Sequence, residues 1–195
     1  MKKAVFLSGI FLLVLVAAPR ASQAQAKVKV DIKRIEVDVL PTPQYAHDGK
    51  DKSYDVRNWV EIEVEFEAEG RTENDFVDDL KFTYYVMMND KETMFVEDLI
   101  HMNVKLGEKT YSVVYLSPTT TEKLLGREAS SAGVVAGVAI EVRLQGALIG
   151  GDATISSKTK WWNEKPQTRG ILRKKSETPF APLWWDRFAD VKSGE

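Results

Sequence analysis

Four glutamates alternate along one stretch of the chain and are its most obvious candidates for chemistry. Glu61, Glu63, Glu65 and Glu67 occupy every second position, and alternate residues of a strand lie about 6 to 7 Å apart. Paired carboxylates at such a spacing carry out glycoside hydrolysis. The same alternation arises on any solvated strand face, and nothing in the sequence supplies an apolar pocket that would raise the pKa of one carboxyl. We therefore expect a water-facing strand surface; a small hydrolase acting through Glu63 and Glu65 is a minor alternative.

The other residues that could bind a metal or act as a base are few. The chain has two histidines, His47 and His101, and no cysteine, so neither a thiol nucleophile nor a four-ligand zinc site is expected. Asp75, Asp78 and Asp79 lack the spacing of a calcium-binding loop. The nucleophile-elbow, zinc-protease and phosphate-loop motifs are absent from the sequence. The sequence thus predicts no catalytic residue, no metal and no cofactor, and we expect a protein that is not an enzyme.

Tryptophans are concentrated near the end of the chain. Four of the five lie in residues 158–195, as two adjacent pairs, and each exposed ring would leave a large apolar area in water. Either this extended segment packs back over the rest of the protein, or it presents the rings to a partner. The candidate binding residues are Trp161, Trp162, Trp184, Trp185 and Arg187.

Alternation with period two runs through most of the chain before this segment and is typical of half-buried β-strands. In residues 28–40 the apolar positions change parity near Lys33 and Arg34, which predicts a β-bulge. Apolar residues at even positions predict that 60–68, 80–88 and 94–106 face a core, with a break between two short strands at Asp98. Further strands are expected at 111–115, 134–144 and 147–155, the last two as a central hairpin.

One short helix is expected at Thr119 to Leu125. Ser117 is a suitable N-cap, Pro118 fits the first turn, and Gly126 is a typical terminator. The expected fold is all-β: an antiparallel immunoglobulin-like β-sandwich with one short helix before the penultimate strand and an extended, Trp-rich C-terminal tail. A closed barrel has the same alternation and remains the alternative.

The first 26 residues have the pattern of a secretory signal: Lys2 and Lys3, an apolar stretch from Ala4 to Ala18, and small residues at Ala24 and Ala26. A retained membrane anchor is the alternative. The domains expected are a signal peptide at 1–26, the β-sandwich at 27–157 and the tail at 158–195. Removing the signal leaves 24 basic against 29 acidic residues, a formal charge of −5, which argues against nucleic acid as a partner.

The tail motif from Trp161 to Pro166, together with the stretch from Pro179 to Phe188, gives the chain a resemblance to a known family. It resembles verrucomicrobial pilus-like proteins that are encoded beside a secretin and a type IV pilus-type assembly platform. This resemblance implies an immunoglobulin-like domain that serves an extracytoplasmic, pilus-related assembly. The apolar N-terminal segment has no acidic residue and contains Pro19, unlike the polymerising helix of a type IV pilin, so an accessory component is expected.

The sequence therefore predicts a non-catalytic structural or interaction component of an extracytoplasmic pilus-like or cell-surface assembly. We expect it in the periplasm, at the outer membrane or on the cell surface. Its expected partners are other proteins of a pilus or envelope assembly, with contact to a host or glycan surface as a further option. The rival hypothesis is a carbohydrate-binding module that stacks sugars on its tandem tryptophans.

Overall fold

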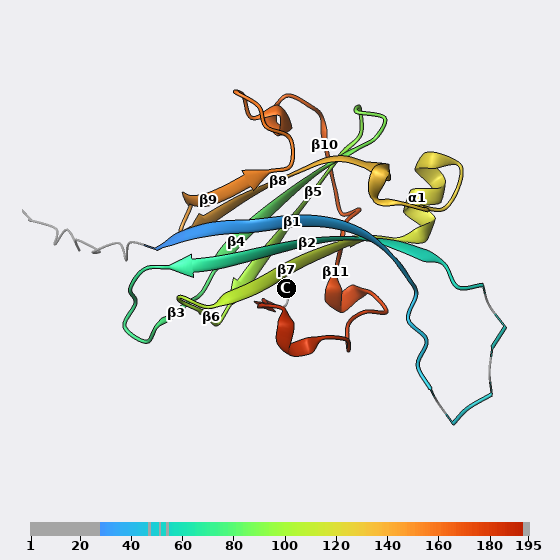
Figure 1. Ribbon diagram of the computed structural model, residues 1–195, viewed down its shortest axis with the longest axis horizontal. Coiled ribbons are helices and arrows are strands. Elements are labelled where there is room, and N and C mark those ends of the chain that lie inside the picture. Colours follow the sequence, from blue (N-terminus) through green and yellow to red (C-terminus); the bar gives the residue numbers. More distant parts are fainter. Residues whose placement is uncertain (1–27, 47, 51, 54, 193–195) are drawn as a thin grey trace, which may run out of the picture.

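The computed structural model describes residues 28–46, 48–50, 52–53 and 55–192. The expected signal peptide at 1–26 lies outside these residues. The described chain is mostly β, with antiparallel sheets and one short α-helix (Figure 1). In this part of the protein, no helix has the length and apolar character needed to cross a membrane.

Two main sheets make up the fold. One has the order β1-β2-β7-β11 and the other the order β10-β5-β4-β8-β9, with β12 also paired to β5; β3 and β6 form a small third sheet. All pairs of named strands are antiparallel except β10 with β5. The strands are β1 (Lys29–Pro41), β2 (Asn58–Glu69), β3 (Phe76–Val77), β4 (Leu80–Met88), β5 (Met94–Met102), β6 (Val104–Lys105), β7 (Lys109–Leu116), β8 (Val135–Leu144), β9 (Ala147–Ala153), β10 (Gln167–Arg169), β11 (Arg173–Lys174) and β12 (Asp190–Val191).

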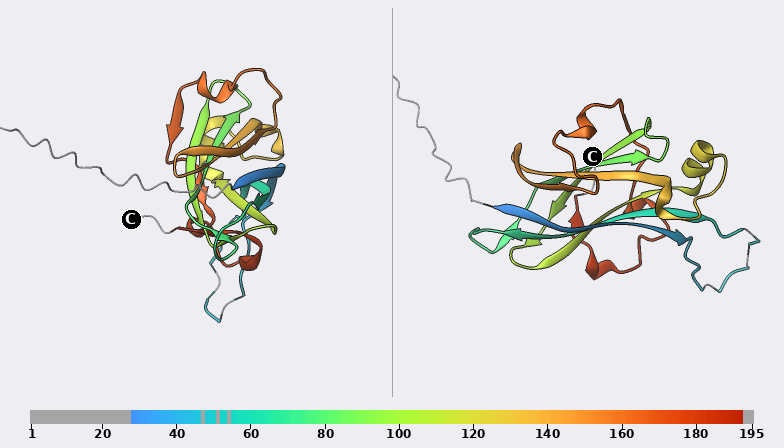
Figure 2. Two further views of the ribbon diagram at one scale, coloured as in Figure 1. Left: turned by 90° about the vertical axis from the view of Figure 1, so that its left-hand side faces the viewer. Right: turned by 45° about the horizontal axis from the view of Figure 1, so that its top comes forward.

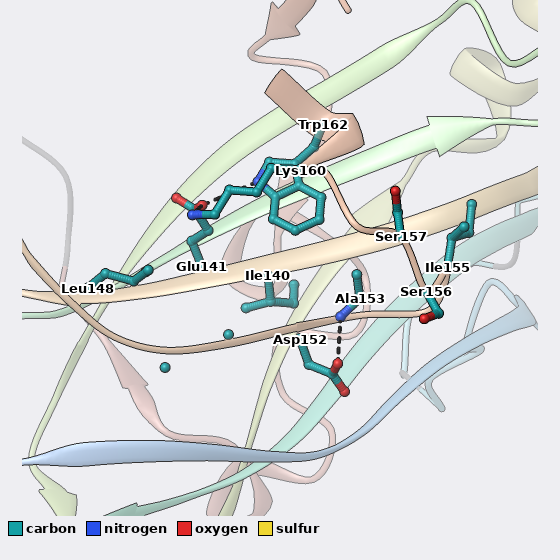
Figure 3. Close-up of a pocket in the computed structure, with 12 residues that line it drawn as sticks. Ile140, Glu141, Leu148, Asp152, Ala153, Ile155, Ser156, Ser157, Lys160 and Trp162 are labelled. Carbon is teal, nitrogen blue, oxygen red and sulfur yellow. Dashed lines mark hydrogen bonds and ion pairs between the residues drawn. The ribbon is translucent and has the colours of Figure 1, made fainter. Parts of the chain in front are cut away.

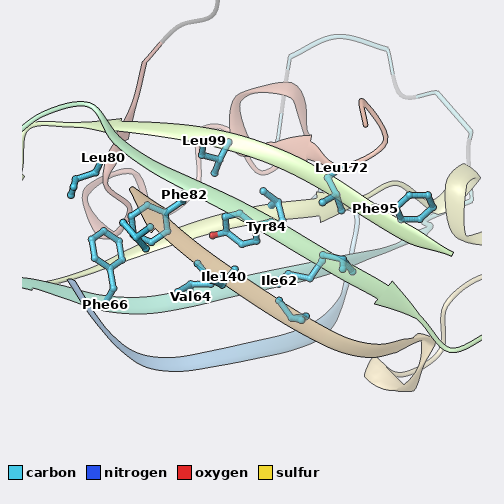
Figure 4. Close-up of a cluster of buried hydrophobic side chains, with 14 of the residues drawn as sticks. Ile62, Val64, Phe66, Leu80, Phe82, Tyr84, Phe95, Leu99, Ile140 and Leu172 are labelled. Atoms are coloured by element: carbon cyan, nitrogen blue, oxygen red, sulfur yellow. The ribbon is translucent and has the colours of Figure 1, made fainter. Parts of the chain in front are cut away.

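The two main sheets share one apolar core. Phe66 of β2 lies against Phe82 of β4 with ring centroids 4.6 Å apart, and both rings are fully buried. Figure 4 shows side chains of both sheets meeting in this cluster. The even positions of β2 and β4 face the core, which confirms the alternation expected there.

The helix α1 (Pro118–Leu125) confirms the expected capping residues. The Ser117 side chain accepts a hydrogen bond from the backbone N–H of Thr120, and Gly126 ends the helix at φ +70°. A left-handed conformation at that position favours glycine. Four 3-10 turns complete the described helices: η1 (Ala132–Val134), η2 (Trp161–Asn163), η3 (Lys175–Glu177) and η4 (Trp185–Arg187).

Strand β1 contains the expected bulge. Its register with β2 shifts between Ile32 and Arg34, and the extra residue moves the following apolar side chains to the other parity. At its N-terminal end β1 approaches β9, the edge of the other sheet. A Cβ atom at Gly150 would overlap the carbonyl oxygen of Val30, so the absence of a side chain allows these two edges to approach closely.

Three expectations about strands were wrong. Strand β5 runs unbroken through Asp98, whose side chain is held by Thr83 and Lys81 of the neighbouring strand. Strand β9 is the edge of its sheet and not a central strand. In β5 the residues facing the shared core are at odd positions, such as Phe95 and Leu99, whereas Met94 and Val96 pack on the opposite face.

The segment from 158 to 192 crosses the side of the molecule between β5 and β7, and its short strands pair with both of them. Strand β10 pairs with β5, Leu172 enters the shared core, β11 pairs with β7, and β12 returns to β5. Figure 2 shows its orange beginning on one sheet and its red end near the other. This path places η2 and η4 on different faces of the protein.

Candidate functional site

The first tryptophan pair packs on the outer face of the six-stranded sheet. Trp161 and Trp162 cover Tyr85, Met94 and Val96, and are themselves only partly exposed. Their rings are almost perpendicular, with an interplanar angle of 89° and centroids 5.4 Å apart. A flat platform for a sugar would need coplanar rings, so this pair mainly completes an apolar cluster that buries the outside of β5 and β4.

A cleft of about 560 Å³ lies beside Trp162 (Figure 3). Glu141 accepts hydrogen bonds there from Lys160 at 2.6 Å and from the Trp162 indole at 3.3 Å, and Arg143 pairs with its other oxygen at 2.7 Å. Burial raises the pKa of Glu141, but these three partners outweigh it and leave the pKa below its usual value. A carboxylate held ionised by two cations is suited to fixing η2 in place and unsuited to acting as a general acid.

The later part of the tail docks on the outer face of the four-stranded sheet. Phe180 is buried there and stacks on Tyr115, with parallel rings and centroids 5.0 Å apart. Trp59 of β2 meets the edge of both rings. The expected strand at 111–115 is confirmed, and its apolar odd positions face this aromatic cluster.

We expect the glutamate row to face water along its whole length, and this expectation is wrong for two of the four residues. Glu61 and Glu63 are each only 8% exposed because the tail covers them. Tyr115 donates a hydrogen bond to Glu61 at 2.6 Å. Burial raises the pKa of Glu61, although the Tyr115 hydrogen bond opposes this shift.

Arg187 forms an ion pair with Glu63. Its guanidinium donates two hydrogen bonds to that carboxylate, at 2.5 and 3.2 Å, and these bonds raise the pKa of Arg187. The same group lies 3.6 Å from the centre of the Tyr111 ring, a cation–π contact. Arg187 is therefore an anchor of the tail, and its planar face is already covered.

The second tryptophan pair projects into solvent. Trp184 is 52% exposed and Trp185 is 70% exposed, between the anchors Phe180 and Arg187. Trp184 has φ +50°, a left-handed backbone that costs a residue with a Cβ atom about 1 kcal/mol or more. The backbone at these two residues is held between the anchors on either side, which sets where both side chains leave the chain.

A second cleft, of about 920 Å³, opens beside Trp185. The edge of β7, strand β12 and the loop from Lys174 to Phe188 line it. Lys175 lies between the rings, with its Nζ 5.7 Å from the centre of Trp185 and 5.3 Å from that of Phe188. The cleft combines aromatic walls with ammonium groups, a combination that suits recognition of a ligand.

Below this cleft lies a buried polar network around His101. Its Nε2 is 2.7 Å from Ser112 Oγ, its Nδ1 is 3.2 Å from the carbonyl oxygen of Asp190, and Tyr84 donates to Ser112 at 2.6 Å. Burial lowers the pKa of His101 to about 4. Ser112 is 1% exposed, so the network ties β4, β5, β7 and β12 together and does not present a nucleophile.

Comparison with known proteins agrees with the fold. A protein-family model matches residues 21–195. The chain belongs to this family. The crystal structure of a protein from Akkermansia muciniphila is similar, with a TM-score of 0.79 and 22% identity, over 90% of this chain and 98% of that one. At this identity the likeness shows a common fold. No curated protein matches the chain significantly.

The similar crystal structure comes from Akkermansia muciniphila, a member of the Verrucomicrobia, the bacterial group to which the resemblance in the sequence pointed. The association with a pilus gene cluster stays a prediction. Within the described ranges, the acidic and histidine side chains form no group of three or more that could hold a metal ion.

The five candidate binding residues form two separate groups in this family member. Trp161 and Trp162 lie with η2 on one sheet, whereas Trp184, Trp185 and Arg187 lie with η4 near the other (Figure 1). Sequence reasoning missed Lys175 and Phe188 as lining residues of the larger cleft. The signal that could have identified them is the run of basic residues from Arg173 to Lys175 within an aromatic-rich tail.

Proposed function

We propose that this protein is a non-catalytic structural or interaction component of an extracytoplasmic type IV pilus-like or cell-surface assembly. The observation that carries the proposal is the exposed pair Trp184 and Trp185, held outward between the buried ring of Phe180 and the Arg187–Glu63 ion pair. Aromatic side chains that are rigid before binding lose little conformational entropy when a partner covers them. The pattern of a secretory signal at residues 1–26 supports an extracytoplasmic location.

The state of the candidate catalytic groups supports a non-catalytic role. Of the two carboxylates in the hydrolase alternative, Glu63 is paired with Arg187 under the tail and Glu65 is paired with Lys109. Glu61 accepts a hydrogen bond from Tyr115. Ser112 and His101 approach each other closely but are buried. Each of these groups contributes to holding strands and tail together.

The proposed architecture for this role is an immunoglobulin-like sandwich. Two antiparallel sheets share one core, and α1 stands between β7 and β8. Such sandwiches serve as rigid supports for binding loops. Here the tail, closing the side between β5 and β7, would supply the binding loop.

The experiment is site-specific crosslinking in the native host, followed by identification of the captured envelope proteins. Trp185 is replaced by a photoreactive phenylalanine analogue, and capture is compared with the same analogue at Leu148, an exposed apolar position on β9. We expect proteins of a pilus or envelope assembly to be captured from position 185 and not from position 148. Equal capture from both positions, or capture of no assembly protein, would refute the proposal.

A carbohydrate-binding module is the second candidate, because Trp185 is both highly exposed and beside a cleft. It would use the Trp184–Trp185 pair, since Trp161 and Trp162 are perpendicular and partly buried. Acrylamide quenching of tryptophan fluorescence tests it. Oligosaccharides that protect wild type from quenching, but have no effect on Trp185→Ala, would favour the carbohydrate-binding module over the assembly role.

A further inference from the structure

The last described strand is held mainly by its backbone. In β12 the residues Asp190 and Val191 pair with β5, and the N–H of Lys192 donates to the Ile100 carbonyl oxygen at 2.8 Å. The side chains of both β12 residues are exposed. The ion pair of Lys192 with Asp79 lies at the surface, where such pairs contribute little to stability. The attachment of this strand therefore depends on a small number of hydrogen bonds.

The imidazole of His101 lies beneath β12. It is fully buried and packs against the rings of Phe66 and Phe82, with centroids 6.0 and 4.9 Å away. Its Nδ1 atom is 3.2 Å from the carbonyl oxygen of Asp190, so β12 covers this edge of the ring. His101 and Asp190 also line the larger cleft. Detachment of β12 would therefore bring water from the cleft to the imidazole.

The hydrogen bonds around this ring run in one direction. The Asp190 carbonyl oxygen can only accept, so Nδ1 of His101 carries the proton. The bare Nε2 atom then accepts from the Ser112 hydroxyl at 2.7 Å, and Tyr84 donates to Ser112 at 2.6 Å. While His101 is neutral, each donor of this series has an acceptor.

A second proton on His101 does not fit this series. It would lie on Nε2, against a Ser112 hydroxyl that donates to the same atom. Ser112 can accept that proton only by turning its own O–H away, and its side chain has no further hydrogen-bond partner among the described residues. A buried charge and an unsatisfied hydroxyl both cost free energy. The charged ring is therefore favoured where water reaches it.

Neighbouring charges do not offset a proton on this ring. In the part of the chain that the structure describes, no carboxylate forms an ion pair with His101. The Asp190 carboxylate attracts positive charge on the ring, but burial outweighs this attraction, and Asp190 already accepts a hydrogen bond from Asn103 at 3.1 Å. The other charged groups around the network are Glu63, Asp78, Asp79 with Lys192, and, across the cleft, Lys174, Lys175 and Glu177.

We propose that residues 189–192 form an acid-released latch: a second proton on His101 detaches them from β5 and β7 while the two sheets stay packed. Detachment hydrates the charged imidazole and opens the larger cleft beside Trp185. The shared core contains no residue of β12, so it does not need to open. This inference goes beyond the proposed function and does not depend on it.

The direction of the pH effect follows from the two states. In the detached state the imidazole has its ordinary pKa of about 6.5, whereas burial lowers the pKa to about 4 in the docked state. The detached state therefore gains the proton first as pH falls. Between pH 7 and pH 4 the ratio of detached to docked chains should rise about 100-fold.

Hydrogen exchange of the full mature chain, corrected for the intrinsic effect of pH on exchange, measures this ratio. The reporters are the N–H groups of Ala189 and Lys192, which donate to Tyr111 and Ile100. We expect their protection to fall about 100-fold between pH 7 and pH 4, while amides of β2 and β4 stay much better protected. In His101→Asn the carboxamide still donates to the Asp190 carbonyl but gains no proton, so protection should not depend on pH.

Two further measurements exclude other causes. Asp79→Asn removes the ion pair of Lys192 and Asp190→Asn removes the carboxylate nearest the ring; both should keep the 100-fold change, because His101 is retained. Nitrogen-15 NMR of wild type at pH 7 should show His101 protonated at Nδ1, a result that does not depend on any variant folding correctly.

Four outcomes would overturn the inference. They are protection of Ala189 and Lys192 that does not change with pH, an equal change in His101→Asn, loss of the change in either aspartate variant, and a ring protonated at Nε2. Loss of protection in β2 and β4 in step with residues 189–192 would also reject the latch, because the whole fold would then be opening.

Discussion

Arg187 and Glu63 are joined by two hydrogen bonds, of 2.5 and 3.2 Å, across 124 positions of sequence. Glu63 is almost buried, whereas Arg187 retains 39% of its side-chain exposure. The pair therefore lies at the border between tail and sheet. Water screens it from one side, but removal of the guanidinium would leave a buried carboxylate without its partner.

Replacement of Arg187 by Met should lower the free energy of unfolding by about 1 to 2 kcal/mol, a value reduced for the partial exposure of the pair. Denaturation in urea measures this change. A double-mutant cycle with Glu63→Gln should recover part of the loss, because the variant carboxamide carries no charge that needs pairing. Arg173→Met, at an exposed position, is the control and should change stability little; an equal loss there would contradict an effect specific to the pair.

Phe180 is the apolar counterpart of this anchor. Its replacement by Ala should cost about 3 kcal/mol, because the ring is 2% exposed and stacked on Tyr115. The loss should appear first as local release of residues 175–188, since the tail is joined to the sheets only by short pairings. Limited proteolysis with mass spectrometry should show faster cleavage in that range.

Val191→Ala provides the matched control for Phe180, because Val191 belongs to the same tail but is 37% exposed. Cleavage of this variant should resemble that of wild type. If Phe180→Ala were also cleaved at the wild-type rate, the ring would not be anchoring the tail.

Strands with one core face and one polar face were predictable from alternation alone. The even positions of β2 and β4 face the shared core as expected, and the Ser117, Pro118 and Gly126 signals placed α1 within one residue of its observed start. The parity change near Lys33 likewise predicted the bulge in β1. These features depend on patterns among residues that are close together in the sequence.

Alternation did not predict which face of β5 and β7 packs into the shared core. The tail covers the outer faces of both sheets, so Met94 and Val96 on β5 and Val113 and Tyr115 on β7 are apolar although they point away from the shared core. An alternation with period two shows which residues lie on the same face of a strand. It does not show which of two buried faces points into the shared core. The Glu63–Arg187 pair was missed for a related reason, since no local pattern links residues so far apart.

His101 should make stability depend on pH. Its pKa in the folded protein is about 4, below the ordinary value of about 6.5, so the unfolded chain gains the proton first as pH falls. Its contribution is complete above pH 6.5 and is lost as pH falls toward 4, by about 3 kcal/mol in total. Urea denaturation of wild type and His101→Asn between pH 7 and pH 4 should show this difference in slope. Parallel slopes would mean that the histidine titrates normally.

Gly150 should be the glycine most sensitive to substitution at the approach of the two sheets. A Cβ atom there overlaps the carbonyl oxygen of Val30 and lies 2.9 Å from the Val30 Cβ atom, so Gly150→Ala must push β9 away from β1. We expect a loss of about 2 kcal/mol in the free energy of unfolding, measured by thermal or urea denaturation. Gly133→Ala is the control, because its Cβ would meet only Ser131 Oγ at 3.5 Å. Equal stability of the two variants would show that β1 and β9 can separate at no cost, and that the approach of these edges does not help to hold the sheets together.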